Sequence, residues 1–289
     1  MSAKIIDGVA VARSIRSRCR DEVADFVAAT GIIPGLAVIL IGSDPASQIY
    51  VRNKIKACKE AGIRSFRFDY ASDVEPPVVL QKIRELNADP NVHGILVQLP
   101  LPPQFNIHEI LLTIDEKKDV DGFHLYNVGG LIAGNTVFPP CTPYGVMELL
   151  RHEGISPEGK NAIVVGASNI VGKPMALMLM QGEATVAICH AKTRDLAQFT
   201  LLADILVVAA GHPNLIRPEM VRPGVVVVDV GINRLPDGRL VGDVDFDGVA
   251  QKASYITPVP GGVGPMTVTM LLVNTIASAK RAVRQPKAG

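Results

Sequence analysis

The sequence predicts an α/β protein built on parallel β-sheets. Short runs rich in valine and isoleucine recur along the chain, and they are apolar at successive rather than alternate positions: 36–42 (LAVILIG), 93–99 (HGILVQL), 162–166 (AIVVG), 204–211 (DILVVAAG) and 224–231 (GVVVVDVG). Such strands are buried on both faces, as in parallel sheets that helices cover on both sides. Segments of helical length separate the runs, which completes the alternation typical of this class.

The first half of the chain is predicted to alternate strands and helices. The expected order is strand 36–42, helix about 45–62, strand 64–70, helix about 76–87 and strand 93–99. Asp44 and Pro45 suit the cap and the first position of the first of these helices. Prolines at positions 100, 102 and 103 end the last strand, because proline lacks the N–H that a sheet ladder needs.

The second half is predicted to form a second domain, since 289 residues suggest about two domains. Its expected elements are a helix near 144–153, a strand at 162–166, a helix from about 170, strands at 185–189, 204–211 and 224–231, a hairpin at 234–244 and a helix at 266–284. The breaker cluster FPPCTP at 138–143 is the predicted junction. The last helix is expected to pack on the first domain, which predicts domains of 1–140 plus 270–289 and of 141–269.

Composition excludes several classes of function. Lysine plus arginine exceeds aspartate plus glutamate by only 29 − 28 = 1, so the whole chain carries no electrostatic footprint for nucleic acid or an anionic membrane. Aromatic residues, at 4%, are too few for a base-stacking platform. The four cysteines form no CxxC and no HExxH occurs, so no metal site is expected. The N-terminus is charged throughout and no apolar stretch has membrane-spanning length, so a soluble cytoplasmic protein is expected.

The segment IVVGASNIVGKP at 163–174 is the sharpest local signal. A buried strand runs into Gly166, and Ser168 and Gly172 follow at the expected start of a helix. Backbone N–H groups in such a turn bind a pyrophosphate, and small residues let it approach. The spacing departs from G-x-G-x-x-G, and a simple tight strand–helix turn is the alternative. The two further strands that follow favour a dinucleotide site.

The residues after the strand at 185–189 bear on which dinucleotide binds. An NAD site usually has an acidic residue about 20 residues past the glycine loop, to hold the ribose hydroxyls. Here Lys192 and Arg194 follow the strand, and no carboxylate appears before Asp195. This pattern favours a 2′-phosphate and therefore NADP; the alternative is that both cations are ordinary solvated loop charges.

Tyr50 and Lys54 lie four residues apart on the first long helix and are therefore neighbours. Val51, Ile55 and Cys58 are expected on the core-facing stripe, with Tyr50 and Lys54 on an adjacent face. Tyrosine can stack on a flat heterocycle, and lysine supplies a cation or, if desolvated, a base. A surface tyrosine over the aliphatic stem of a lysine is the alternative.

Three further motifs stand where ligands could bind. Gln98 ends a predicted parallel strand, where open α/β sheets receive ligands, and its amide can read a donor–acceptor edge. Asp121 lies in DVDGFH at 119–124; its carboxylate suits a guanidine-like edge, or the Asp-Gly pair is only a turn. The glycine-dense segment TPVPGGVGPMT at 257–267 suits close approach to a flat ligand, or is a structural turn.

Together these motifs resemble one family, the bifunctional methylenetetrahydrofolate dehydrogenase/methenyltetrahydrofolate cyclohydrolases. The resemblance covers nearly the whole chain and rests on motifs in the family's order: YVRNK (50–54), VQLPLP (97–102), DVDGF (119–123), PCTP (140–143), the 166–174 loop, VVDVGIN (227–233), GDVDF (242–246) and TPVPGGVGPMT (257–267). It implies two domains flanking a cleft, with a three-layer α/β folate-binding catalytic domain at 1–140 plus 270–289 and a Rossmann-like NAD(P)-binding domain at 141–269.

The resemblance also implies the reactions and the residues that carry them. 5,10-Methylenetetrahydrofolate would give a hydride to NADP, and water would open the methenyl product to 10-formyltetrahydrofolate, in one-carbon metabolism that serves purine, methionine and histidine biosynthesis. Lys54 would be catalytic, with Tyr50, Gln98 and Asp121 beside it. The implied folate-binding residues are Tyr50, Lys54, Val97, Gln98, Leu99, Asp121, Pro260, Gly261, Gly262, Val263 and Gly264. The implied cofactor residues are Gly166, Ala167, Ser168, Ala191, Lys192 and Ile232. A homodimer is implied as well.

Two departures from the family pattern concern the 2′-phosphate. The family's loop often reads Gly-Arg-Ser, but Ala167 stands here in place of the arginine. After the second strand the family often has His-Ser-(Arg/Lys)-Thr, but Ala191 replaces the serine. Lys192 and Arg194 could compensate. Weaker NADP binding, or use of NAD, is therefore predicted.

The competing interpretations are three. A dehydrogenase that has lost cyclohydrolase activity is disfavoured by the presence of both Tyr50 and Lys54. A cofactor-sensing protein without turnover would need only the nucleotide loop. A dehydrogenase for another substrate would lack the set of Tyr50, Lys54 and Asp121.

Overall fold

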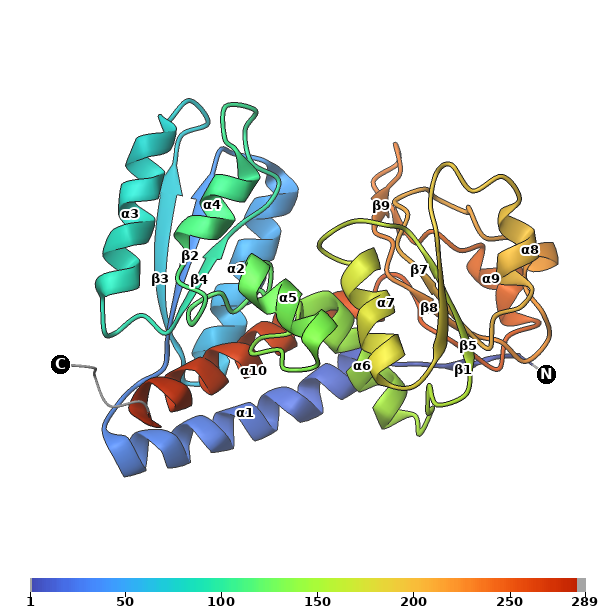
Figure 1. The fold of residues 1–289 in the computed structure, drawn as a ribbon, viewed down its shortest axis with the longest axis horizontal. Coiled ribbons are helices and arrows are strands. Elements are labelled where there is room, and N and C mark those ends of the chain that lie inside the picture. Colours follow the sequence, from blue (N-terminus) through green and yellow to red (C-terminus); the bar gives the residue numbers. More distant parts are fainter. Residues whose placement is uncertain (1, 285–289) are drawn as a thin grey trace. The chain divides into compact units, whose positions relative to one another are not determined.

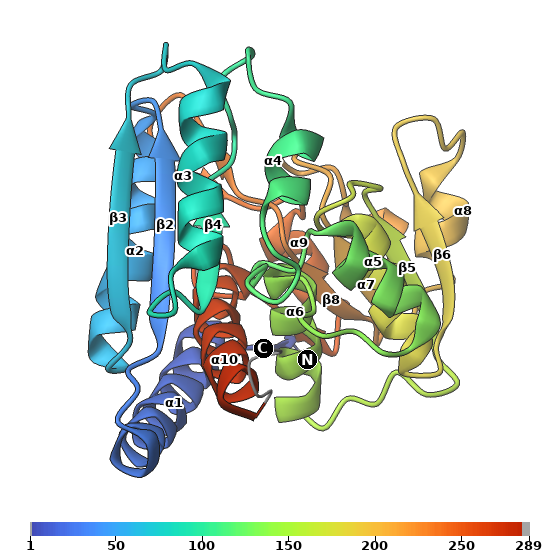
Figure 2. The ribbon, with the colours of Figure 1, turned by 60° about the vertical axis from the view of Figure 1, so that its left-hand side comes forward.

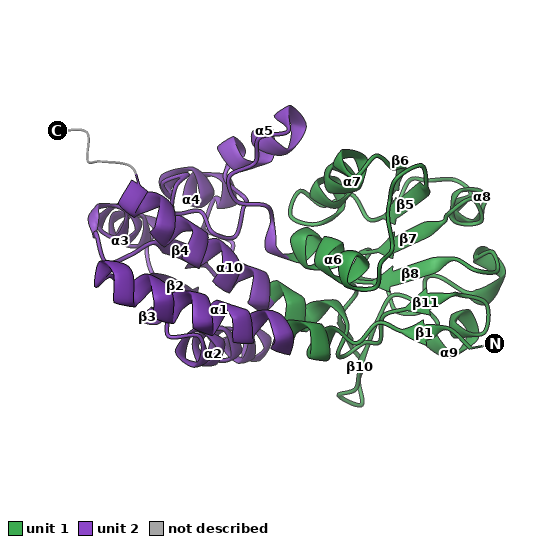
Figure 3. Cartoon of the chain, turned by 90° about the horizontal axis from the view of Figure 1, so that it is seen from below, with its two compact units in different colours: residues 1–12, 142–267 green, residues 13–141, 268–289 purple. Residues whose placement is uncertain are grey.

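The structure is a computed structural model that describes residues 2–284 (Figure 1). The chain divides into two compact units, coloured separately in Figure 3. Unit 1 comprises the chain up to residue 12 together with 142–267, and unit 2 comprises 13–141 and the chain from 268 onward. The residues up to 12 thus belong to unit 1, which differs from the predicted grouping of 1–140 in one domain.

Unit 1 is built on a six-stranded sheet in which every neighbouring pair is parallel. In spatial order its strands are β1 (Lys4–Ile5), β11 (Tyr255–Ile256), β8 (Val226–Asp229), β7 (Ile205–Val208), β5 (Asn161–Val165) and β6 (Thr185–Cys189). The four longer strands confirm the sequence prediction. The two-residue strands β1 and β11 were not predicted, because so short a segment carries no periodicity.

The order of these strands reverses at β5. From β5 the chain passes through α7 (Gly172–Gln181) to β6 at one edge and then returns to β7 on the other side of β5. The loops that leave the carboxyl ends of β5 and β7 therefore diverge. Ligands of open α/β sheets bind at such a switch point.

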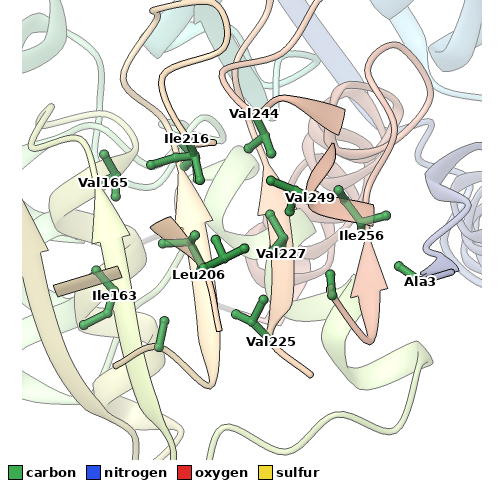
Figure 4. Packing of buried hydrophobic residues seen from close by; sticks show 14 of the residues in the cluster. Ala3, Ile163, Val165, Leu206, Ile216, Val225, Val227, Val244, Val249 and Ile256 are labelled. Atoms are coloured by element: carbon green, nitrogen blue, oxygen red, sulfur yellow. The ribbon is translucent and has the colours of Figure 1, made fainter. Parts of the chain in front are cut away.

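Register explains the core of unit 1. Ile163, Leu206, Val227 and Ile256 are paired across four neighbouring strands, so they point to the same face of the sheet, where they pack with Val244 and Val249 (Figure 4). The smaller elements of this unit are α6 (Cys141–His152), α8 (Leu196–Thr200), the 3₁₀ helix Pro218–Met220, α9 (Phe246–Ala250) and the antiparallel hairpin β9 (Asn233–Arg234) with β10 (Leu240–Val241). The hairpin confirms the prediction from RLPDGRLVGDV.

Unit 2 contains a parallel three-stranded sheet with the same reversal. Its order is β3 (Arg64–Tyr70), β2 (Gly35–Ile41) and β4 (Gly94–Val97), with α2 (Pro45–Glu60) and α3 (Pro76–Ala88) as the connections. Figure 2 shows α3 in front of the sheet and α2 behind it. Every residue of β2 is buried, as expected for a central strand covered on both faces. The α/β prediction is confirmed in both units.

In the described part of the chain, four further helices belong wholly or mostly to unit 2. They are α1 (Gly8–Thr30), α4 (Ile107–Thr113), α5 (Leu125–Ala133) and α10 (Val263–Arg284), of which α1 and α10 begin in unit 1. No element before residue 36 is predicted from the sequence, so α1 is a finding of the structure. Asn274 of α10 donates its side-chain amide to the Val120 and Pro139 carbonyls, at 2.9 and 3.0 Å, which holds α10 to unit 2. Within residues 2–284, no helix combines the length and apolarity needed to cross a bilayer.

Candidate functional site

In unit 2 the switch point of the sheet brings Gln98 and Lys54 together. Gln98 directly follows β4, and its backbone N–H donates to the Ile39 carbonyl of the neighbouring strand at 2.9 Å. The helix α2 leaves β2 at the same edge, and its start is fixed by Asp44, whose carboxylate accepts from the Ser47 N–H at 2.7 Å. The predicted cap is therefore confirmed, and it sets the register that carries Lys54.

Lys54 occupies the buried face of α2 and not the adjacent face that was predicted. Its side chain is only 7% exposed, on the same face as Val51 and Cys58, both at 0%, whereas Ile55 is only partly buried. Positions 47, 51, 54 and 58 follow the helical spacing of three and four residues, so a core stripe that includes Lys54 fits the helix better. The aliphatic stem of the lysine replaces an apolar core residue here.

The geometry of the Gln98 amide aims an acceptor at Lys54. Gln98 Nε2 donates to the Leu99 carbonyl at 2.6 Å, and Gln98 Oε1 accepts from Lys54 Nζ at 3.0 Å. Since the amide NH₂ already has a backbone acceptor, the oxygen is the atom left to face the ammonium. One of the three donors of the lysine is thereby used, and two remain for other partners.

Asp121 lies close enough to Lys54 for their charges to interact. Removal of the Asp121 carboxyl from water raises its pKa, and the charge of Lys54 and a hydrogen bond from Cys141 oppose that rise. Burial also raises the pKa of the Cys141 thiol well above its usual range, and the Asp121 charge adds to the effect. The Asp-Gly turn packs tightly, because a Cβ at Gly122 would lie 2.6 Å from the Pro140 nitrogen. Lys54, Gln98, Asp121 and Cys141 thus form one cluster in unit 2.

The remaining predicted residues of unit 2 lie around this cluster on the same elements. Tyr50, one turn before Lys54, is half-buried, and burial raises the pKa of its hydroxyl. Val97, the last residue of β4, is buried, and Leu99 is partly exposed. Asp119, which the sequence analysis did not single out, supports the turn by accepting from the His124 N–H at 2.8 Å and the Asn127 amide at 2.7 Å.

In unit 1 the predicted nucleotide loop lies at the switch point between β5 and β7. Gly166 has a φ of +127°, and a Cβ there would lie 2.2 Å from the Ala209 carbonyl oxygen. A Cβ at Gly172 would lie 2.0 Å from the Gly166 carbonyl oxygen. Both positions therefore require glycine, and the backbone stays open to a close ligand. The Ser168 hydroxyl accepts from the Val171 and Gly172 N–H groups, at 3.2 and 3.3 Å, and holds the loop on the start of α7.

The other predicted cofactor residues are on the surface of unit 1. Ala167 is partly exposed at the loop, and Ala191 and Lys192 are exposed directly after β6, as is Arg194. The His190 side chain orders this turn by accepting from the Lys192 N–H at 3.2 Å. The loop has small side chains and the turn carries cations, so these residues fit a dinucleotide with an added phosphate.

The predicted folate loop Pro260–Gly264 also belongs to unit 1, where it leads into α10. Gly261 has a φ of +109°, and a Cβ at Gly262 would lie 2.6 Å from the Pro258 carbonyl oxygen. A Cβ at Gly264 would lie 3.8 Å from Ile232 Cδ1. The predicted folate loop is therefore a direct neighbour of a predicted cofactor residue.

Comparisons with known proteins establish the family of the chain. The sequence profile described as "Tetrahydrofolate dehydrogenase/cyclohydrolase, catalytic domain" matches residues 6–121, and the one for the family's "NAD(P)-binding domain" matches residues 140–283. The bifunctional protein FolD of Nitrosospira multiformis is 56% identical over 282 residues, which cover 98% of each chain. The chain belongs to the tetrahydrofolate dehydrogenase/cyclohydrolase family. The family resemblance found in the sequence is thereby confirmed.

Solved structures of this family have the same fold. The bifunctional enzyme FolD of Campylobacter jejuni has 53% identity and a TM-score of 0.95, covering 97% of this chain and 99% of its own. The methylenetetrahydrofolate dehydrogenase-cyclohydrolase of Trypanosoma brucei, solved with NADP and an inhibitor, has 42% identity and a TM-score of 0.95, covering 99% of this chain and 100% of its own. The predicted fold class is confirmed.

Two buried acids of unit 1 were given no role by the sequence analysis, although both lie in motifs quoted there. Asp229 ends β8 within VVDVGIN, and Asp243 lies in GDVDF. Burial raises the pKa of Asp229 to about 6, although backbone N–H donors from Asp243, Val244 and Gly231 oppose the rise. An aspartate at the carboxyl end of an apolar parallel strand is the signal that could have identified this residue.

The raised pKa of Asp229 predicts a pH dependence of stability. Because the folded state binds the proton more tightly than the unfolded chain does, the contribution of this group to stability is full below about pH 4 and is lost as pH rises through 6. A rise from 3.8 to about 6 corresponds to about 3 kcal/mol. We expect the unfolding free energy of wild type minus that of Asp229→Asn to fall by roughly this amount between pH 4 and pH 7. Chemical denaturation at several pH values measures it, and a difference independent of pH would contradict it.

Proposed function

We propose that this chain oxidises 5,10-methylenetetrahydrofolate to 5,10-methenyltetrahydrofolate with NADP and hydrolyses the product to 10-formyltetrahydrofolate. The observation that carries the proposal is the hydrogen bond between buried Lys54 and Gln98 at the switch point of the unit 2 sheet. Membership of the family and the dinucleotide-type loop of unit 1 support it. The relatives from Nitrosospira multiformis and Campylobacter jejuni are described as bifunctional.

The hydrolysis requires protons to be moved, and Lys54 is the residue proposed to move them. Water adds to the bridging carbon of the methenyl cation and loses a proton, which leaves a hydroxyl adduct. The hydroxyl then loses its proton as the carbonyl forms and the bond from that carbon to one ring nitrogen breaks, and the nitrogen takes up a proton, so that one proton is released overall. An amine held near the carbon can accept the first proton and deliver one to the nitrogen. Gln98 Oε1 holds Lys54 Nζ at 3.0 Å, so the amine is positioned before the substrate binds.

Asp121 and Tyr50 are proposed to bind and orient the folate. The Asp121 carboxylate can accept two N–H bonds from the guanidine-like edge of the pterin, while Tyr50 presents a flat ring to its face. Val97 and Leu99 flank Gln98 in sequence, and Pro260, Gly261, Gly262, Val263 and Gly264 are proposed to contact the folate through their backbone. The hydride step itself needs little acid or base, because the neighbouring folate nitrogens stabilise the cation that forms, so orientation is the main requirement.

The cofactor is proposed to be NADP, with weak discrimination against NAD. When bound, NADP supplies the hydride acceptor. Gly166, Ala167 and Ser168 would receive the pyrophosphate, and Ile232 would contact the cofactor. Lys192 and Arg194, exposed after β6, would attract the 2′-phosphate. Since Ala167 and Ala191 offer no side-chain donor there, NAD should also be used.

Replacing Lys54 with methionine separates the two reactions. We expect Lys54→Met to lower cyclohydrolase activity by roughly 10²–10⁴-fold, because general acid–base catalysis is lost. Dehydrogenase activity should fall by no more than about tenfold, since that step needs no proton transfer. Assays of NADP reduction and of methenyl hydrolysis measure this, with methenyl accumulation as the signature.

Lys56→Met is the matched control for Lys54→Met. Lys56 lies on the same helix with its side chain 78% exposed, so both activities should stay at wild-type levels. Loss of both activities to the same extent in Lys54→Met would contradict the assigned role. Absence of NADP and NAD reduction by the wild type would overturn the dehydrogenase proposal.

Lys192 provides the test of cofactor preference. We expect Lys192→Ala to raise the KM for NADP by about tenfold, equivalent to about 1.4 kcal/mol for a lost charge-assisted contact. The KM for NAD should stay unchanged, because NAD has no 2′-phosphate. Lys160→Ala, which removes an exposed lysine before β5, is the control. A strong NADP preference in the wild type would contradict the proposed use of NAD.

The protein is further proposed to be a cytoplasmic homodimer. All four cysteines are free and buried, which is consistent with a reducing compartment. The strand β6 is an edge of its sheet, and exposed apolar side chains gather on it and beside α8: Ile188 at 42%, Phe199 at 39%, Leu201 at 43% and Leu202 at 62%. Such an edge favours association with a second copy.

A charge on this surface should dissociate the dimer. We expect the wild type to sediment as a dimer and Leu202→Glu as a monomer, because an unpaired carboxylate would be buried in the interface. Ile132→Glu, on the exposed side of α5 in unit 2, should remain dimeric. Sedimentation velocity measures all three. A monomeric wild type would overturn the proposal.

A further inference from the structure

Asp229 and Asp243 hold three loops of unit 1 through their buried carboxylates. Asp229 is 4% exposed and accepts from the backbone N–H groups of Gly231, Asp243 and Val244, at 2.9, 3.0 and 2.9 Å. Asp229 therefore fixes the turn after its own strand β8 and ties it to the segment after β10.

Asp243 makes the complementary set of contacts. It is fully buried, and one carboxylate oxygen accepts from the Ala210 and Gly211 N–H groups at 2.6 and 2.8 Å. The other oxygen accepts from the Asn233 side-chain amide at 2.8 Å. A single carboxylate thus joins the loop after β7 to the residue that follows Ile232.

Glycines make room for both acids. A Cβ at Gly242 would lie 1.9 Å from an oxygen of Asp229, and a Cβ at Gly231 would lie 2.2 Å from an oxygen of Asp243. Asp229 thus packs against Gly242, the neighbour of Asp243, and Asp243 packs against Gly231, which lies in the turn after Asp229. The segments 229–231 and 242–244 therefore pack against each other, each with its glycine against the carboxylate of the other.

Burying Asp229 and Asp243 side by side lowers the stability of the folded state, so a gain in stability does not explain why both are present. Within residues 2–284, neither carboxylate forms an ion pair with a lysine, arginine or histidine. Two neighbouring buried carboxylates without a cation destabilise the folded state, and the charge of Asp243 contributes to the raised pKa of Asp229. Costs of this kind persist where a site needs the geometry they impose.

The loops held by Asp243 are those at the switch point of the sheet. Ala210 and Gly211 directly follow Ala209, whose carbonyl packs against Gly166 of the proposed pyrophosphate loop. Asn233 directly follows Ile232, a proposed cofactor contact. By contrast, Lys54 and Gln98 belong to unit 2.

We propose that Asp243, supported by Asp229, is a positioning residue for the dinucleotide: its carboxylate holds the 210–211 and 232–233 segments in the shape that receives the cofactor. This inference rests on the proposed function. It implies a division between the two activities, because methenyl hydrolysis uses no dinucleotide. Loosening these loops weakens cofactor binding and leaves the hydrolysis intact.

The sharpest test changes the partner of Asp243. Asn233→Asp places a carboxylate against the Asp243 carboxylate, so the 232–233 segment is pushed away by like charge. We expect the Kd for NADP, measured by calorimetry, and the KM for NADP to rise at least tenfold. The dehydrogenase kcat at saturating NADP should change less than threefold, and hydrolysis assayed without dinucleotide less than twofold.

An exchange of the two residues should restore binding. In Asn233→Asp with Asp243→Asn, the amide oxygen at position 243 accepts from Ala210 and Gly211 while its NH₂ donates to the new carboxylate at position 233. We expect the Kd for NADP of this double variant to return to within threefold of wild type. Gln251→Glu adds the same charge at an exposed amide of unit 1 and should bind NADP as the wild type does.

The outcomes separate this proposal from a structural role and from the proposed function. The positioning role is overturned if Asn233→Asp binds NADP normally, if its hydrolysis falls as far as its NADP affinity, or if the folded double variant binds no better than Asn233→Asp. Circular dichroism reports folding. A wild type that neither binds nor reduces NADP would overturn the proposed function as well.

Discussion

The switch points of two parallel sheets are the constraint on which both candidate sites depend. The carboxyl ends of all strands in a parallel sheet lie on the same side of the sheet. Where the strand order reverses, the loops that leave two neighbouring strands diverge. In unit 2 the reversal lies between β2 and β4, and Gln98 and Lys54 lie there. In unit 1 it lies between β5 and β7, where the Gly166 loop packs on Ala209. The reversal of strand order thus determines the position of both candidate sites.

Backbone groups at these edges need partners, and buried side chains supply them. Gln98 uses its NH₂ on a neighbouring carbonyl, which leaves its oxygen for Lys54. Asp119 supports the turn that carries Asp121, and Asp229 and Asp243 do the same for the loops of unit 1. Polar residues that contact no ligand can therefore matter for binding, because a loop without regular structure keeps its shape only when its N–H groups are satisfied.

Burial gives the central lysine its chemical character. Because Lys54 lies on the buried stripe of α2, its ammonium is largely removed from water; it donates to the Gln98 amide oxygen and interacts with the nearby Asp121 carboxylate. Two of its donors remain for a reacting water or a substrate. Such an arrangement is prepared before the substrate arrives, which is the requirement for proton transfer at a fixed position.

The sequence by itself determined the fold class, most strand positions and the family. An apolar run such as 36–42 predicts a strand buried on both faces, and Asp44-Pro45 starts a helix through local hydrogen bonding. Both features can be predicted from the sequence without knowledge of tertiary contacts. The short strands β1 and β11 could not be predicted from the sequence, because two residues form a strand only when neighbouring strands of the sheet pair with them.

Tertiary structure alone decided which face of α2 is buried and what Asp229 and Asp243 hold. Side-chain polarity favoured Ile55 on the inner stripe, but the fold places Lys54 there, with Gln98, 44 residues later in the chain, as its partner. Asp243 meets Ala210 from 33 residues away. Local sequence specifies local hydrogen bonds, whereas the partners of a buried charge come from distant segments that only the folded chain brings together.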